Sequence, residues 1–260
     1  MKNEFIVKMQ QGRRCVGTFS HISSETAIEG LAYAGMDFVI IDGEHGTVGP
    51  ETVQKLVRAA NLHKMTPFVR TRDCSRGSVL SMLEAGAQGL VVPQINTADE
   101  VRSLVQNARY YPEGSRGVFL GGNGGYGFAE FAEKGLQNYF DVCNRETLLF
   151  PQCETRGCLE SIEEIAMIPG VDGIFIGPYD LSVALSIPGQ FDRPEFAAAV
   201  ERIKAAVKAA GKRIITYTVK PEAVAGFFDE GFDAVALNVD VALMISLMRD
   251  TVRRARGEWI

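Results

Sequence analysis

Short apolar runs recur along this chain and alternate with segments of helical periodicity, and this alternation constrains the fold more than any other feature. A strand covered by helices on both faces carries apolar side chains on both faces, so its sequence is a continuous apolar run. Between most of these runs, apolar residues recur with the i, i+3, i+4, i+7 spacing of a helix with one buried face. We expect strands over residues 15–20, 38–41, 67–69, 90–92, 148–150, 174–176, 213–217 and 234–237.

Eight strand–helix units in 260 residues predict a (β/α)8 TIM barrel that forms a single domain over residues 1–260. An open, doubly wound sheet is the alternative, and the near-constant repeat favours the barrel. The repeat breaks at a glycine-rich segment between Tyr111 and Tyr126, and a helix is expected over about 128–143. The last helix, 241–254, has an apolar side that we expect to pack on the barrel or on a neighbouring subunit, or to be exchanged with one.

Composition excludes several classes of partner. The net charge is −5 and no block of basic residues is present, which argues against nucleic acid and anionic membranes. No run of about 20 apolar residues occurs, so no transmembrane helix is expected. The five cysteines are unevenly spaced and contain no Cys-x-x-Cys pair, which is typical of free thiols in a reducing cytoplasm.

Polar residues follow several of the predicted strands at their C-terminal ends, where TIM barrels carry their active sites. In an open sheet these residues would also lie along one edge, so the expectation does not depend on the topology. They are Asp42, Arg70, Gln94, Glu154 and Asp180, with His45 just after the first.

Glu154 and Asp180 are candidate metal ligands. Two carboxylates with room for water suit Mg2+ or Mn2+ better than a closed zinc site. Gln152 lies two residues before Glu154, so both side chains are expected to point the same way. The alternative is that each carboxylate caps a helix, as Asp180 could at a helix start, or pairs with a nearby arginine.

His45 lies in a loop between glycines, and it is either a surface histidine or a general base tuned by Asp42. His21 and His63 have weaker sequence contexts.

Arg70 ends a buried strand, where an arginine is costly unless it meets an anion. It either pairs permanently with Asp42 or Glu84, or binds a substrate oxyanion.

These residues carry a resemblance to the HpcH/HpaI aldolase family, whose members are metal-dependent class II pyruvate aldolases built on a (β/α)8 barrel. The resemblance extends from about Gly17 to Val239. The segments that carry it are Ile41-Asp42-Gly43-Glu44-His45, Pro67-Phe68-Val69-Arg70, residues 89–93, Gln152-Cys153-Glu154-Thr155 and residues 171–182.

The resemblance implies cleavage of a 4-hydroxy-2-oxo acid, of the 2-keto-3-deoxy acid type, to pyruvate and an aldehyde. Glu154 and Asp180 match the metal ligands, for Mg2+, Mn2+ or Co2+. Arg70 matches the arginine that holds the pyruvate keto oxygen, and His45 with Asp42 matches the acid–base pair. The family also implies a homohexamer, a trimer of dimers, acting on small molecules.

Further matches concern the pyruvate and its surroundings. Gln152 matches a glutamine beside the bound pyruvate, and backbone N–H groups around Tyr179 and Asp180 match its carboxylate site. Relatives often carry aspartate where this chain has Glu84, which is a catalytic candidate as a proton relay and otherwise structural. The glycine-rich segment 121–127 and Phe19 are expected to face the aldehyde.

Alternative functions follow from single features. A malyl- or citramalyl-thioester lyase would keep the metal but would call for a basic groove for coenzyme A, and none is evident. A non-catalytic, small-molecule-binding barrel would tolerate loss of either carboxylate.

A Schiff-base aldolase needs a lysine in a strand, and only Lys220 comes near one. The Gly122-x-Gly124-x-x-Gly127 pattern does not open a first βαβ unit, which argues against dinucleotide binding.

Overall fold

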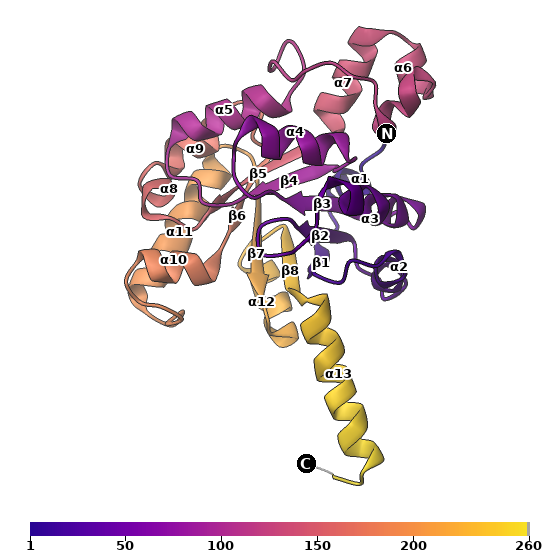
Figure 1. Ribbon diagram of the computed structural model, residues 1–260. Coiled ribbons are helices and arrows are strands. Elements are labelled where there is room, and N and C mark those ends of the chain that lie inside the picture. Colours follow the sequence, from indigo (N-terminus) through magenta and orange to yellow (C-terminus); the bar gives the residue numbers. More distant parts are fainter. Residues whose placement is uncertain (259–260) are drawn as a thin grey trace.

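The computed structural model describes residues 1–258 and is a closed barrel of parallel strands in sequence order (Figure 1). The last strand pairs with the first, which excludes the open doubly wound sheet. The predicted runs all lie within strands, most of which extend one to three residues further. The strands are β1 (Cys15–Ser20), β2 (Phe38–Asp42), β3 (Thr66–Arg70), β4 (Gly89–Val92), β5 (Leu148–Cys153), β6 (Gly173–Ile176), β7 (Arg213–Thr218) and β8 (Ala234–Val239).

Helices connect the strands on the outside of the barrel. Within residues 1–258, none is both long and apolar enough to cross a membrane. The helices are α1 (Glu4–Gln10), α2 (Glu25–Tyr33), α3 (Pro50–Leu62), α4 (Arg76–Glu84), α5 (Ala98–Ala108), α6 (Glu130–Glu133), α7 (Leu136–Glu146), α8 (Arg156–Glu160), α9 (Ile162–Met167), α10 (Pro178–Ala184), α11 (Pro194–Ala209), α12 (Val224–Asp229) and α13 (Asp240–Ala255), with 3-10 turns η1 (Gly122–Gly127) and η2 (Pro221–Ala223).

Two apolar layers hold the barrel together, because successive strand side chains point to opposite faces. In β2, Phe38 and Ile40 belong to the cluster inside the barrel. Val39 and Ile41 belong to the outer cluster between the strands and the helices. Covering both faces of each strand explains why the strands read as continuous apolar runs.

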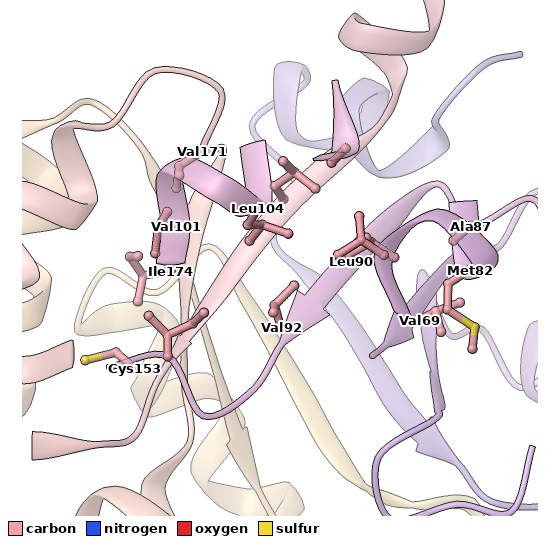
Figure 2. Close-up of a cluster of buried hydrophobic side chains, with 14 of the residues drawn as sticks. Val69, Met82, Ala87, Leu90, Val92, Val101, Leu104, Cys153, Val171 and Ile174 are labelled. Carbon is pink, nitrogen blue, oxygen red and sulfur yellow. The ribbon is translucent and has the colours of Figure 1, made fainter. Parts of the chain in front are cut away.

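Figure 2 shows part of the outer layer, where Leu90 of β4 and Ile174 of β6 lie near Val101 and Leu104 of α5. Cys153 belongs to the same layer and is fully buried. Since Cys153 points outward, its two neighbours in sequence point to the inside, as expected from the alternation.

The helix α1 closes the barrel at the N-terminal ends of the strands, and the sequence did not predict it. Phe5 is fully buried, and its ring centroid lies 5.6, 5.2 and 6.4 Å from those of Phe38, Phe68 and Phe150. The Asn3 side chain caps the helix by accepting the Phe5 N–H at 3.1 Å. One aromatic side chain therefore fills the bottom of the barrel.

The single helix expected over 128–143 is wrong, because two helices occupy this region. Gly135 lies between α6 and α7 with φ +101°, a left-handed conformation that favours glycine. The chain therefore turns there instead of continuing as one helix.

Candidate active site

A cavity of about 280 Å3 opens at the C-terminal ends of the strands. Five predicted site residues line it: His45, Arg70, Gln152, Tyr179 and Asp180. Two others, Asp42 and Glu154, are almost completely buried directly behind it. These seven residues come from β2, β3, β5 and β6 or the turns after them, so four strands bring them to one mouth of the barrel.

Asp42 and Arg70 form a two-pronged ion pair across neighbouring strands. Nε of Arg70 donates to Oδ1 of Asp42 at 2.8 Å, and Nη2 donates to Oδ2 at 2.6 Å. Nη1 lies 3.1 Å from Oε2 of Glu44, and the guanidinium lies over the ring of Phe19 at 4.7 Å. Three of the five N–H donors of the guanidinium are engaged, which leaves two for an oxygen in the cavity. The permanent pair and the oxyanion site are therefore compatible.

The histidine on Asp42 is His21, not His45. Nε2 of His21 lies 2.8 Å from Oδ2 of Asp42. The side chain of His45 is 65% exposed, with Nε2 3.9 Å from Oε2 of Glu44, and only its backbone N–H reaches Asp42. The predicted pairing of the His45 and Asp42 side chains is therefore not formed. The backbone N–H groups of Glu44 and His45 turn toward Asp42, while the His45 ring lies at the solvent-exposed rim of the cavity and does not contact Asp42.

Asp42 stays ionised at neutral pH. Burial pushes the pKa of its carboxyl up, but the opposing effects are stronger in sum. They are the hydrogen bonds and charge of Arg70, the Glu44 N–H and the His21 ring, and they hold the pKa below its usual value.

Glu154 follows β5 and is 2% exposed. Oε1 accepts the Gln94 backbone N–H at 2.8 Å and the Gln94 Nε2 at 3.2 Å, and Oε2 accepts from Nε2 of Gln152. The pKa of Glu154 is raised to about 7, chiefly by burial and also by the nearby charges of Asp180 and Glu44, which together outweigh the lowering effects of the Gln94 N–H and of Arg70. A divalent cation would offset this concentration of carboxylates, so the donor set fits a metal ion.

Asp180 is exposed in the first turn of α10, where Gly177 is the N-cap and Pro178 the first helical residue. The capping alternative for Asp180 is therefore wrong. A Cβ on Gly177 would lie 2.4 Å from Oε2 of Glu154 and 2.6 Å from Nε2 of Gln152. The absence of a side chain at Gly177 thus lets β5 bring its carboxylate up to the start of α10.

Within residues 1–258, no group of three or more His, Cys, Asp or Glu side chains is arranged around one metal position. Two carboxylates would leave the remaining coordination positions to water and substrate, which is the arrangement that Mg2+ accepts.

Glu84 lies outside the cavity of its own chain, so the structure does not bring this catalytic candidate to the site. It ends α4 and accepts a hydrogen bond from Nη2 of Arg116 at 2.8 Å. The glycine-rich segment lies beside it, since a Cβ on Gly121 would be 3.0 Å from Oε2 of Glu84. Of the two parts expected to face the aldehyde, only Phe19 lines the cavity.

Residues without a strong signal in the sequence complete the site. His21, Phe175, Tyr217 and Val239 line the cavity, and Gln94, in a left-handed conformation with φ +56°, binds Glu154. Their position at or just after strand ends is the signal that could have found His21, Tyr217 and Val239.

Comparisons with known proteins agree along the chain. The family model for HpcH/HpaI aldolase/citrate lyase matches residues 15–246. The chain is 32% identical over 259 residues to the hydroxypyruvate/pyruvate aldolase of Sagittula stellata, which covers 99% of this chain and 98% of that protein. It is 33% identical over 247 residues to the 2-keto-3-deoxy-L-rhamnonate aldolase of Klebsiella pneumoniae, covering 94% and 89%. An HpcH/HpaI aldolase/citrate lyase family protein from Burkholderia cenocepacia superposes with a TM-score of 0.89 at 27% identity, covering 98% of this chain and 100% of that one.

Proposed function

The chain belongs to the HpcH/HpaI aldolase/citrate lyase family and is a carbon–carbon lyase of the class II aldolase type, and we propose that it cleaves a 4-hydroxy-2-oxo acid of the 2-keto-3-deoxy acid type to pyruvate and an aldehyde. The observation that carries this proposal is the meeting of Glu154, Asp180 and Arg70 at one cavity. Such a site can stabilise negative charge that develops on the keto oxygen of the substrate.

The family implies a divalent metal ion, and we propose that Glu154 and Asp180 hold it. Carboxylate oxygens favour Mg2+ or Mn2+, with Co2+ as a third candidate. The raised pKa of Glu154 supports this assignment, as does the buried Oε1 of Gln152, which has no hydrogen-bond partner among residues 1–258. When bound, the ion supplies a Lewis acid for the keto oxygen.

The residues of the chain bind and orient the pyruvate half. The two unengaged N–H groups of Arg70 would donate to the keto oxygen and to the enolate oxygen formed from it. The backbone N–H groups of Tyr179 and Asp180, in the first turn of α10, would donate to the carboxylate, and Gln152 would lie beside it. The resemblance assigns proton transfer to His45 with Asp42.

The aldehyde half is expected to be uncharged. Phe19, Phe175 and Tyr217 form much of the remaining cavity wall, with Phe19 edge-to-face against both of the others. Among the described residues that line the cavity, Arg70 is the only lysine or arginine, and Asp42 and Glu44 already engage it. A second carboxylate on the aldehyde would therefore find no cation.

Pyruvate release from a panel of 4-hydroxy-2-oxo acids with apolar, hydroxylated and carboxylated tails tests the proposal. We expect pyruvate release with Mg2+, Mn2+ or Co2+ and no release with EDTA. Substrates with uncharged tails should be preferred. The variants Glu154→Ala and Asp180→Ala should lose turnover. Borohydride with pyruvate should leave the enzyme active. Turnover that survives EDTA and is destroyed by borohydride would indicate Schiff-base chemistry instead. Cleavage of malyl- or citramalyl-thioesters alone would identify a thioester lyase, and no turnover at all would indicate a binding barrel.

We also propose a homohexamer, a trimer of dimers, in which α13 packs on or is exchanged with a neighbouring subunit. The apolar side chains exposed on α13 support this assembly. All five cysteines are free, which is typical of a cytoplasmic protein.

A further inference from the structure

We propose that His21 transfers the proton of the substrate hydroxyl in the aldolase reaction, an inference that rests on the proposed function. His21 directly follows β1 and lines the cavity, with its side chain 32% exposed. Its Nε2 lies 2.8 Å from Oδ2 of the fully buried Asp42. The ring thus has one nitrogen on a buried carboxylate while the side chain reaches the site.

The partner defines which ring nitrogen can act. An ionised carboxylate accepts hydrogen bonds and donates none, and Asp42 is held ionised by Arg70. Nε2 of His21 must therefore carry a hydrogen and donate it to Asp42. Nδ1 is left as the nitrogen that accepts a proton in the neutral ring. The carboxylate of Asp42 thereby fixes both the orientation and the tautomer of the imidazole ring.

The backbone of His21 is held as firmly as its ring. Asp240, at the start of α13 and 5% exposed, accepts the His21 N–H at 2.9 Å and the Ile22 N–H at 3.1 Å. The Ser20 hydroxyl donates to the same carboxylate at 2.7 Å. By contrast, His45 is fixed to Asp42 only through its backbone N–H. His21 therefore meets the requirement of an acid–base residue for a fixed orientation better than His45 does.

The reaction needs only the substrate, the His21 ring and one water molecule, which is regenerated. Nδ1 of His21 takes the proton from the C4 hydroxyl, and the oxygen electron pair forms the aldehyde C=O. The C3–C4 bond breaks, and its electrons form the C2=C3 double bond of the enolate while the keto oxygen gains the negative charge. Water then protonates C3, and the imidazolium returns its proton to the resulting hydroxide.

Three histidine-to-glutamine variants test the assignment through pyruvate release from the substrate that the wild-type enzyme cleaves best. Glutamine in His21→Gln can still donate to Asp42 but cannot carry a proton. We expect kcat to fall about 100-fold or more, the usual contribution of general acid–base catalysis, while KM stays within about threefold. His45→Gln should lose less than His21→Gln. His63→Gln, outside the cavity, serves as the matched control and should keep the wild-type kcat.

Imidazole rescue separates proton transfer from a structural role. In His21→Ala, free imidazole should restore part of kcat in proportion to its concentration, and it should have no such effect on wild-type enzyme. A His21→Gln variant with wild-type kcat, a larger loss in His45→Gln, or an absence of rescue would overturn the proposal for His21 alone. A wild-type enzyme that releases no pyruvate from any acid of the panel would instead overturn the proposed function, and this inference with it.

Discussion

Gly177 shows how one missing side chain shapes the candidate metal site. Because a methyl group there would lie 2.4 Å from Oε2 of Glu154, Gly177→Ala must displace that carboxylate. We expect kcat/KM to fall about 100-fold, the cost of a displacement of about 1 Å at a reacting centre. Gly30→Ala is the matched control, because its Cβ meets nothing within 4 Å inside α2. The control should keep full activity and gain about 0.5–1 kcal/mol in urea unfolding. Full activity in Gly177→Ala would contradict the crowding argument.

Asp42 links the site to the pH dependence of stability. The pKa of Asp42 is lowered in the folded protein from 3.8. Its contribution to the free energy of unfolding is therefore fully present above pH 3.8 and is lost as the pH falls through its pKa in the folded protein. Asp42→Asn should destabilise the protein by about 3–5 kcal/mol at pH 7, because Arg70 loses its buried partner, and by less at pH 3. Urea unfolding at both pH values measures this. Asp229→Asn, the exposed partner of Arg14, should cost less than about 1 kcal/mol, and a pH-independent cost of Asp42→Asn would refute the linkage.

Helix α1 is an element whose stability comes from tertiary packing. A seven-residue helix is marginal alone, so its position depends on Phe5 inside the barrel. Phe5→Ala should cost about 3–5 kcal/mol in urea unfolding. Because α1 closes the end of the barrel opposite the cavity, kcat of the folded variant should stay near that of wild type. Gln10→Ala, exposed at the end of the same helix, is the control and should change stability by less than about 0.5 kcal/mol. A small effect of Phe5→Ala would show that α1 is dispensable.

The strands could be predicted from sequence while two helical features could not, and the reason is physical. The sequence of a strand buried on both faces is a continuous apolar run, so the strand can be predicted without knowing which strands pair with it. Helix α1 carries one fully buried residue, Phe5, in seven, so it has no periodic signal. The break at Gly135 falls inside a pattern that stays helical on either side, and only its left-handed φ distinguishes a turn from a tolerated glycine.

For the candidate site, the residues at the strand ends could be predicted from the sequence, while the contacts between their side chains could not. Arg70 and Glu154 could be placed at the cavity because every parallel strand ends at the same mouth of a barrel. Which side chains pair there depends on contacts between strands, and His21 meets Asp42 only once β1 and β2 are neighbours. The position of Glu84 depends on the direction of a whole helix, since α4 runs back from the strand ends and carries it away from the mouth.

At the scale of the whole molecule, α13 projects away from the barrel after its first turns (Figure 1). Among the elements within residues 1–258, its main contacts are with β1 and β8, and apolar residues remain exposed along its length, among them Met244, Ile245, Met248 and Val252. These four share one face at helical spacing. An apolar face of this kind on a projecting helix is typical of a subunit contact. We therefore expect the proposed hexamer to depend on α13.

Met248→Glu tests this dependence, because it places a charge at the centre of the apolar face and would leave it unpaired in a subunit contact. We expect the mass measured by light scattering after size-exclusion chromatography to fall from that of a hexamer to that of a smaller species. Arg253→Glu changes the charge on the opposite side of the helix and is the control, with an unchanged mass. The barrel closes within one chain and its apolar core comes from that chain alone. Circular dichroism should therefore show a folded protein in both variants. A monomeric wild type, or a hexamer that survives Met248→Glu, would rule out α13 as the assembly element.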